Sequence, residues 1–543
     1  MANGLPPLPD IPAEQRTPWV EVLLGIVHAQ QDRIRVLEET VLQLRDEIAI
    51  LKGQKPRPKI APSRLEQPAP KPPLAEGQKR PGSQKRSKNA ELTITREIHI
   101  PFPDPPAGSV SKGFEPYIVQ EQVIIVEATC YFRERIVTPD GRSLLAPLPA
   151  DVLPGQHFGP DLISYIIHQY HNNHVTQPLL LDELTQRGIR ISAGQISHIL
   201  TEDKEIFHQE KAELLPAGLA SADYIQVDDT GARHDGKNGY CTQIGNEFFA
   251  FFASTDSKSR LNFLEVLRGE KRDYVINEVA VEYWKKYELS VALITSLTEG
   301  PTHFVDAAAW NARLKTLGVT DARLVRITTE GALLGSLIAQ GVSTDLVVLS
   351  DGAGQFNILV HAACWVHAER PLARMIPYNE EHRLAIERVR QEIWELYQDL
   401  KAYRQQPQPE QIPVLTARFE ALCAQRTSYP SINTVLKEMC KHQADLLRVL
   451  DRPEVPLHNN ASESDIRDYV KKRKISGSTR SDDGRRCRDT FASLKKTCRK
   501  LGIRFLDYLH DRIRGLGKVP RLADLIRQRA GESTAGQAEA VPP

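Results

Sequence analysis

The chain has 543 residues, of which 41% are hydrophobic and 26% charged; this is ordinary for a folded globular protein and too long for one hydrophobic core. No run of 18 apolar residues occurs and the start lacks a basic and apolar leader, so we expect neither a membrane span nor a signal peptide. The seven cysteines show no CxxC spacing, which argues against a disulfide framework or a zinc ribbon and fits a reducing cytoplasm.

The net charge of +1 hides two basic blocks. Residues 52–88 carry eleven Lys or Arg against two Glu, and residues 467–500 carry thirteen against four Asp. Two such blocks on a near-neutral chain predict a polyanionic partner. The alternative is that each block is simply a solvated surface, and for the proline-rich first block the two interpretations are equally good.

Residues 18–52 show a seven-residue apolar repeat. One core position holds β-branched residues and the other mostly Leu, which favours a parallel two-stranded coiled coil and hence a homodimer or higher oligomer. The alternative is an amphipathic helix packed on its own chain. The repeat consists of Val20, Val27, Ile34, Val41 and Ile48, and of Leu23, Gln30, Leu37, Leu44 and Leu51.

Two segments of different composition follow. Residues 53–91 are rich in Pro, Lys, Gln and Ser, which predicts a disordered basic linker. Residues 92–157 contain the β-branched run YIVQEQVIIVEATCYFRERIV and the turn signal TPDGRS, which together predict a small β-containing module.

Residues 158–215 change to helical spacing. The second of three predicted helices ends at Gly188, and Ser192 is a candidate N-cap for the third. Two short helices joined by a tight turn predict a helix-turn-helix-like DNA-binding domain, in which Gln195 and His198 lie on the exposed face of the recognition helix. An ordinary helical hairpin is the alternative.

The next part of the chain predicts an α/β core. Residues 222–256 read as an antiparallel three-stranded meander, a helix follows, and a buried apolar strand ends in LSDG. This is the element order of an RNase H-like core, which we expect over 222–368, with an insert at about 268–344, and over 457–515. A helical insertion at 369–456 interrupts it, and 516–543 form a tail. The expected fold class is therefore multidomain α+β.

That fold brings together carboxylates from the first strand, the end of the fourth strand and a late helix. Asp228, Asp351 and Glu463 occupy these three places. Converging carboxylates suit two Mg²⁺ ions about 4 Å apart, for which Mn²⁺ can substitute, and such ions activate a water or 3′-hydroxyl and stabilise the leaving oxygen. Each acid taken alone has a simpler explanation as a turn cap or as a partner of a helix dipole.

Three segments resemble the transposases of the insertion sequence 66 family. The first places Asp228 at the catalytic position of an Asp-Glu-Thr motif, with Asp229 in place of the Glu. A departure is the lack of a Cys-rich module, because Cys130 stands alone in that region, so we expect no structural zinc. The three segments are YIQVDDTGARHDGKNGYCTQIGNEFFAFFASTDSKSR, LSDGAGQFN with CWVHAERPL, and HNNASESDIR.

The resemblance implies a DDE-type transposase. Such an enzyme binds the terminal inverted repeats of an insertion sequence, cleaves the ends to give 3′-hydroxyls and joins them to target DNA. Asp228 and Asp351 would be shared metal ligands, and Glu463 would complete the second metal site. The resemblance further implies action in the bacterial cytoplasm at the nucleoid, with accessory transposition proteins as possible partners.

Further candidates lie near these acids in the sequence. Arg467, Lys471 and Lys474 follow Glu463 at helical spacing and are predicted to bind DNA phosphates; an i,i+4 salt bridge with solvated lysines is the alternative. Cys364 and His367 are three residues apart, and core packing is favoured over metal binding because no second pair accompanies them.

Two other functions remain open at this stage. The chain could be a DNA-binding protein of transposase descent that has lost catalysis, or an RNase H-like nuclease that cuts structured DNA without joining it. Substitution of Asp228 separates the first from an enzyme, and an assay for strand joining separates the second.

Overall fold

The computed structural model describes residues 93–539, except 107, 150–151 and 153–156, together with Thr17, Trp19, Val20, Leu23, Val27 and Gln30. The last five of these six positions are helical, but the predicted coiled coil at 18–52 otherwise lies outside the described residues, as does the predicted linker at 53–91. The chain divides into two compact units. The first includes Glu205–Ile503 and Pro520–Pro543, and the second includes Gln67–Lys204 and Arg504–Val519.

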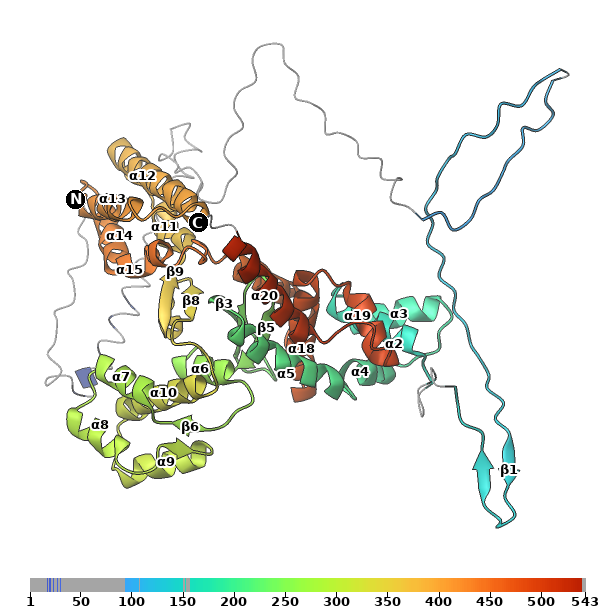
Figure 1. Ribbon diagram of the computed structural model, residues 1–543, viewed down its shortest axis with the longest axis horizontal. Coiled ribbons are helices and arrows are strands. Elements are labelled where there is room, and N and C mark those ends of the chain that lie inside the picture. The colour runs from blue at the N-terminus through green and yellow to red at the C-terminus, as the bar shows by residue number, and fades with distance from the viewer. Residues whose placement is uncertain are drawn as a thin grey trace. The chain divides into compact units, whose positions relative to one another are not determined.

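A five-stranded mixed sheet forms the centre of the first unit (Figure 1). Its strand order is β5-β4-β3-β8-β9; β3, β4 and β5 are antiparallel neighbours, whereas β8 runs parallel to both β3 and β9. The predicted meander and the predicted later strand are both confirmed. The strands are β3 (Tyr224–Gly231), β4 (Tyr240–Gly245), β5 (Ala250–Thr255), β8 (Val347–Ser350) and β9 (Val360–Ala363).

Helix α18 (Asp482–Lys500) covers the edge of this sheet at β5. Every fourth residue of a helix advances about 6.0 Å along the axis, and every second residue of a strand advances about 6.8 Å. Every fourth residue of α18 can therefore lie opposite every second residue of β5 over a short distance. Three N–H groups of β5 therefore donate to buried side-chain oxygens of α18. The pairs are Ala250 with Thr497 (3.1 Å), Phe252 with Ser493 (2.9 Å) and Ser254 with Asp489 (2.7 Å).

Three further helices complete the surroundings of the sheet. Helix α17 (Asn460–Ser476) packs on β3 and β4, and α5 (Glu205–Ala220) packs on α18. Helix α20 (Leu522–Glu539) lies along α5, where the N–H of Leu522 donates to Glu210 at 3.0 Å. The segment predicted as a tail therefore includes a packed helix.

The stretch predicted as an insert at about 268–344 folds as a helical layer after α6. Its longest helix packs against α6 and α7, and Trp284 and Trp310 are fully buried within it. The layer follows α6 (Arg260–Arg268), and its elements are β6 (Tyr274–Val275), α7 (Glu278–Lys286), α8 (Val291–Thr298), β7 (His303–Phe304), α9 (Ala307–Thr316) and α10 (Ala322–Ala339).

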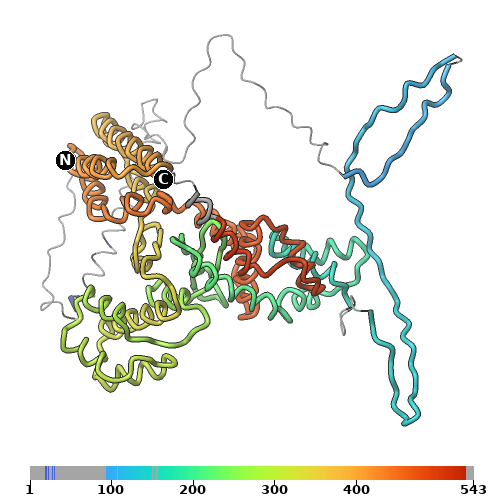
Figure 2. The backbone as a smooth tube through the Cα atoms, viewed as in Figure 1, coloured from blue at the N-terminus to red at the C-terminus, as the bar shows by residue number. Residues whose placement is uncertain are grey.

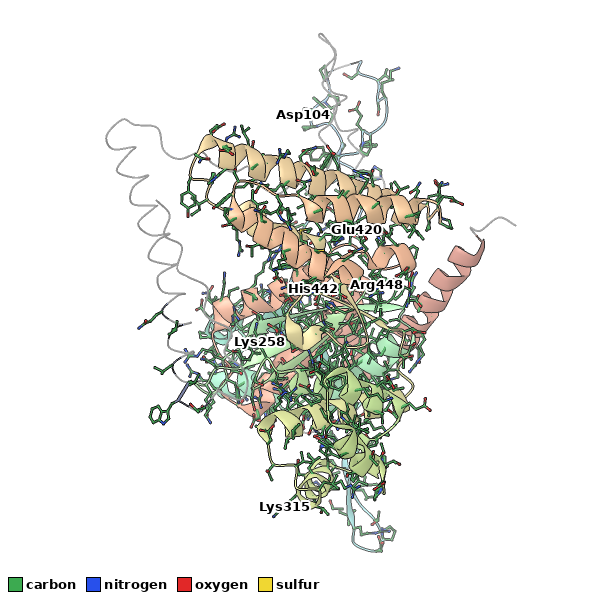
Figure 3. The ribbon with its side chains drawn as sticks, turned by 90° about the vertical axis from the view of Figure 1, so that its left-hand side faces the viewer. Asp104, Lys258, Lys315, Glu420, His442 and Arg448 are labelled. Atoms are coloured by element: carbon green, nitrogen blue, oxygen red, sulfur yellow. The ribbon has the colours of Figure 1, made fainter. Side chains whose placement is uncertain are left out.

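The predicted helical insertion at 369–456 has an apolar core of its own, which includes Trp365, Tyr397 and Phe419. Figure 3 labels Glu420, His442 and Arg448 in this layer, Lys258 at the level of the sheet and Lys315 in the earlier insert. Its helices are α11 (Trp365–Arg374), α12 (Glu380–Gln405), α13 (Gln411–Ala424), α14 (Pro430–Lys441), α15 (Gln443–Leu446) and α16 (Arg448–Asp451).

The second unit contains the predicted helix-turn-helix segment. Gly188 has a positive φ of 85° after α3, and Ser192 forms a capping box with Gln195 at the start of α4, as the turn chemistry predicts. Helix α19 packs against α2, and Arg514 pairs with Asp161 at 2.7 Å. The helices are α2 (Pro160–His171), α3 (Gln177–Gln186), α4 (Ala193–Thr201) and α19 (Phe505–Arg514).

Two predicted boundaries differ from the observed units. The helical domain expected at 158–215 ends at Lys204, because α5 packs on α18 and α20 of the first unit. Helix α19, expected within the catalytic core at 457–515, belongs to the second unit because it packs on α2. Helix-to-helix pairing over hundreds of residues leaves no local sequence signal, which explains both differences.

Residues 93–149 form fewer strands than predicted. The turn at TPDG joins a short antiparallel hairpin of β1 (Arg135–Val137) and β2 (Ser143–Leu145). The strand expectation is wrong for 117–134, which have no regular secondary structure and trace a long extended path in Figure 2. Tyr117 and Ile125 are 91% and 82% exposed. β-branched residues favour a strand only where a neighbouring strand packs against them, and the described residues supply none here.

The contacts between α18 and β5 give a test of how the sheet edge is stabilised. Thr497→Val keeps the side-chain volume but leaves the N–H of Ala250 unpaired, at a cost of about 1–3 kcal/mol. We expect the β5 amides to exchange hydrogen about tenfold faster or more, measured by hydrogen–deuterium exchange. Thr497→Ser keeps the hydroxyl and should exchange at close to the wild-type rate; equal acceleration in both variants would contradict this account.

Candidate active site

Asp228 lies in the central strand β3 on the face that meets helix α17. Its neighbour on that face, Gln226, accepts a hydrogen bond from the N–H of Ser462 at 3.3 Å. Burial raises the pKa of Asp228 to about 7; the hydrogen bond from the Asp229 N–H opposes this, and the negative charges of Asp351, Asp229 and Glu463 add to the increase. Asp228 therefore interacts with both of the other carboxylates predicted from the sequence.

Asp351 directly follows strand β8, next to β3 in the sheet. The parallel register pairs Gln226 with Leu349, and Asp228 and Asp351 each lie two residues beyond that pair. A carboxylate oxygen of Asp351 accepts from the N–H of Ala353 at 2.9 Å, and Gly352 adopts a φ of +94° that favours glycine. The parallel register thus brings Asp351, at the carboxyl end of β8, beside Asp228 in β3, just beyond the paired stretch.

Glu463 lies in the first turn of α17, and the start of this helix is attached to β3. The side-chain amide of Asn459, which is fully buried, donates to the carbonyl of Val227 at 2.8 Å. The N–H of Asn459 in turn contacts Cys364 Sγ at 3.3 Å. Asn459 is also the N-cap residue, although its side chain makes this contact to the strand instead of capping the helix.

Two side chains from α11 contact Glu463. Arg370 and His367 approach its Oε1 atom at 3.2 Å and 3.4 Å. Burial lowers the pKa of His367, and the charge of Arg370 lowers it further. Core packing is confirmed for Cys364, which is 1% exposed, but His367 faces the acid site instead. The i,i+3 spacing of His367 and Arg370 indicates that the two share a helix face, but not that this face meets Glu463.

Asp229 has a separate environment on the other face of β3. Its side chain pairs with Lys258, labelled in Figure 3, and accepts a hydrogen bond from the amide of Gln355 at 2.7 Å. Asp229 is thereby neutralised by its own partners. This contrast supports Asp228 over Asp229 as the acid that faces Asp351 and Glu463.

The donor set of the site has the chemistry that Mg²⁺ prefers. Mg²⁺ prefers carboxylate oxygens, and none of the ion pairs of the described residues includes Asp228 or Asp351, although the charge of Lys258 acts on Asp351 as well as on its partner Asp229. No group of three or more His, Cys, Asp or Glu side chains within the described part of the chain is placed to hold a metal ion as it stands. Glu463 is engaged by Arg370 and His367. The residues fit a divalent cation in kind, and Glu463 must change partner to join it.

Part of the second basic block is unavailable to DNA. Lys495 pairs with Asp468 at 2.6 Å and Lys500 with Asp465 at 2.9 Å, which joins α18 to α17. Lys472 is also buried. The count of positive charges in 467–500 therefore overstates the basic surface.

The predicted DNA-binding residues of α17 are among the exposed members of that block. Arg467, Lys471 and Lys474 all lie in solvent, and Arg467 also approaches Glu463 Oε2 at 3.8 Å. The second unit exposes Gln195 and His198, as predicted. Gln195 Oε1 accepts from the Ser192 N–H at 2.9 Å, and His198 lies 2.7 Å from Glu202, so both side chains already have partners within α4 and at its end.

Comparison with known proteins identifies the class. The sequence profile of the Transposase IS66 family matches residues 335–486, a span that contains Asp351, the helical insertion and Glu463. A protein of Sinorhizobium fredii named Uncharacterized protein y4jO is 42% identical over 321 residues, which are 58% of this chain and 100% of that protein. The chain belongs to the insertion sequence 66 family of transposases.

Membership of this family implies a DNA-processing enzyme and a DNA partner. None of the described helices is both long enough and apolar enough to cross a membrane.

The raised pKa of Asp228 predicts a pH-dependent stability for the metal-free protein. Because the pKa of about 7 in the folded chain exceeds the ordinary value of 3.8, this carboxyl stabilises the fold fully below pH 3.8 and loses that contribution as the pH rises through 7. Asp228→Asn, which stays neutral, should be more stable than wild type at pH 8 by a few kcal/mol and nearly equal at pH 4.

Thermal unfolding in a chelator at the two pH values measures this difference. Asp256→Asn is the control, because the Asp256 side chain is 96% exposed at the end of β5 and should give no pH-dependent difference. A loss of stability at pH 8 in Asp228→Asn would overturn the account.

Proposed function

We propose that this transposase binds the terminal inverted repeats of an insertion sequence, cleaves the ends to give 3′-hydroxyls and joins them to target DNA. The observation that carries the proposal is that the β3–β8 register and the contact of Asn459 with Val227 bring Asp228, Asp351 and Glu463 to one side of the sheet, where the charges of Asp351 and Glu463 act on Asp228. Their elements follow the order of an RNase H-like core: the first strand, the end of the fourth strand and a late helix.

Asp228 and Asp351 would hold the divalent cations, and Glu463 would complete the site. Bound Mg²⁺, or Mn²⁺ in its place, supplies an activated water or 3′-hydroxyl and stabilises the leaving oxygen. By holding the cations in place, the three acids would position the reacting phosphate. Asp228 must be ionised to serve as a ligand, and a cation beside it would lower its raised pKa.

Binding of DNA is proposed for two surfaces. Arg467, Lys471 and Lys474 would contact phosphates beside the scissile bond, because they are exposed on the helix that carries Glu463. Gln195 and His198 would face DNA from α4 of the second unit, where they are exposed. A homodimer or higher oligomer through residues 18–52 and assistance from accessory transposition proteins complete the proposal.

Cleavage of the DNA that flanks the gene tests this function. Purified protein is incubated with that DNA and Mg²⁺ or Mn²⁺, and the 3′ ends are mapped. We expect metal-dependent nicks at inverted repeats, which Asp228→Ala, Asp351→Ala and Glu463→Ala each reduce by at least about 100-fold while end binding persists.

Asp256→Ala is the matched control, since it removes an exposed carboxylate after a different strand of the same sheet and should leave cleavage intact. Binding without nicks under either metal would contradict the enzyme and favour a DNA-binding protein of transposase descent. Nicks without joining of supplied ends would favour a nuclease.

A further inference from the structure

We propose that Arg370 is an exchangeable counterion of the acid site: it neutralises Glu463 in the free protein and moves to a DNA phosphate when metal ions and DNA bind together. The inference rests on the proposed function. It adds a residue and a coupling between metal and DNA that the three acids alone do not supply.

The pair lies where exchange is possible. Arg370 Nη2 is 3.2 Å from Glu463 Oε1, and the two side chains are 36% and 23% exposed. Solvent therefore reaches both groups, and an ion pair of this kind is weak enough for another ligand to replace. Buried pairs elsewhere in the helical insertion, such as Arg390 with Glu369 at 9% and 3% exposure, lack this access.

The helix that carries Arg370 is a fixed platform. Trp365, at the start of α11, is fully buried, and its ring N–H donates to the carbonyl of Leu446 at 2.8 Å. Glu369, the residue before Arg370, is held by Arg390. The backbone of Arg370 is thus anchored on its buried side, and the guanidinium at the end of a long side chain is the part that can change partner.

Two basic side chains contact the same carboxylate oxygen of Glu463. Arg370 and His367 both approach Oε1, and Arg467 lies 3.8 Å from Oε2. In this arrangement no three His, Cys, Asp or Glu side chains of the described residues are placed as a metal site. A divalent cation between the acids must therefore displace the guanidinium, and the positive charge of Arg370 opposes its approach.

A DNA phosphate is the partner that Arg370 would take next. A guanidinium binds a phosphate through two parallel N–H donors, as it does a carboxylate, so the exchange keeps its hydrogen bonds. The reacting phosphate must lie beside the acids, within reach of the same side chain. Metal and DNA binding would then strengthen each other, because both require the Arg370–Glu463 ion pair to break. Bound metal frees Arg370 for the phosphate, and bound DNA frees Glu463 for the metal.

The first test measures Mn²⁺ binding to the full chain without DNA, by the loss of the electron paramagnetic resonance signal of free Mn²⁺. Arg370→Gln should bind Mn²⁺ about fivefold more tightly than wild type, because it removes both the competitor and a repelling charge. Arg374→Gln is the matched control: it removes the same charge one turn later on α11, from an exposed position, and should stay within about twofold of wild type. Equal or weaker binding by Arg370→Gln would overturn the proposal.

The second test measures affinity for end DNA with Ca²⁺, a cation that binds oxygen ligands, and without it. Ca²⁺ should strengthen DNA binding by wild type and by Arg374→Gln more than by Arg370→Gln, and the salt dependence of Arg370→Gln should be shallower by about one phosphate contact. An identical gain from Ca²⁺ in all three proteins would refute the transfer to phosphate.

Two controls separate this proposal from the proposed function. If Asp228→Asn and Glu463→Gln abolish Mn²⁺ binding and Arg370→Gln does not strengthen it, the counterion proposal fails and the metal site stands. If the wild type binds no Mn²⁺, or binds it unchanged in both acid variants, the metal site itself fails. Thermal unfolding of each variant shows that a change in affinity does not reflect loss of the fold.

Discussion

A single buried amide joins the two segments that carry the first and third acids. Asn459 Nδ2 donates to the carbonyl of Val227, which immediately precedes Asp228, and Asn459 lies one helical turn before Glu463. Because Asn459 is fully buried, the alternative to this contact is an unpaired polar group in the core, which is costly. The hydrogen bond therefore fixes the start of α17 against β3, and the position of Glu463 relative to Asp228 depends on it.

The charged side chains around the candidate site fall into two groups, those that form ion pairs within the fold and those that do not. Asp229 has Lys258 and Gln355 as partners, and the lysines of α18 are taken up by acids of α17, so these groups stabilise the fold. Asp228 and Asp351 form no ion pair among the described residues, and Arg370, the partner of Glu463, is partly exposed. Perturbed charges of this kind mark a candidate functional site.

The sequence predicted what local patterns encode. Apolar runs and turn residues predict the meander and β8, Ser192 predicts the start of α4, and motif spacing predicts that Asp228, Asp351 and Glu463 form one site. Contacts made through space were missed: nothing beside Arg370 in the sequence indicates Glu463, and the basic block at 467–500 does not reveal that several of its lysines are buried. At 117–134 the local pattern was misleading. Its β-branched residues favour a strand, but no partner strand lies beside this segment among the described residues.

The most direct test of the account is a crystal of the protein soaked in Mn²⁺, with anomalous scattering used to locate the metal. The account predicts an anomalous peak between the carboxylates of Asp228 and Asp351, at distances of about 2.0–2.2 Å from their oxygens, with the Glu463 side chain turned away from Arg370. A protein that remains folded and shows no peak at this edge of the sheet, or a peak held by other residues, would contradict the claim that these three acids form one metal-dependent site.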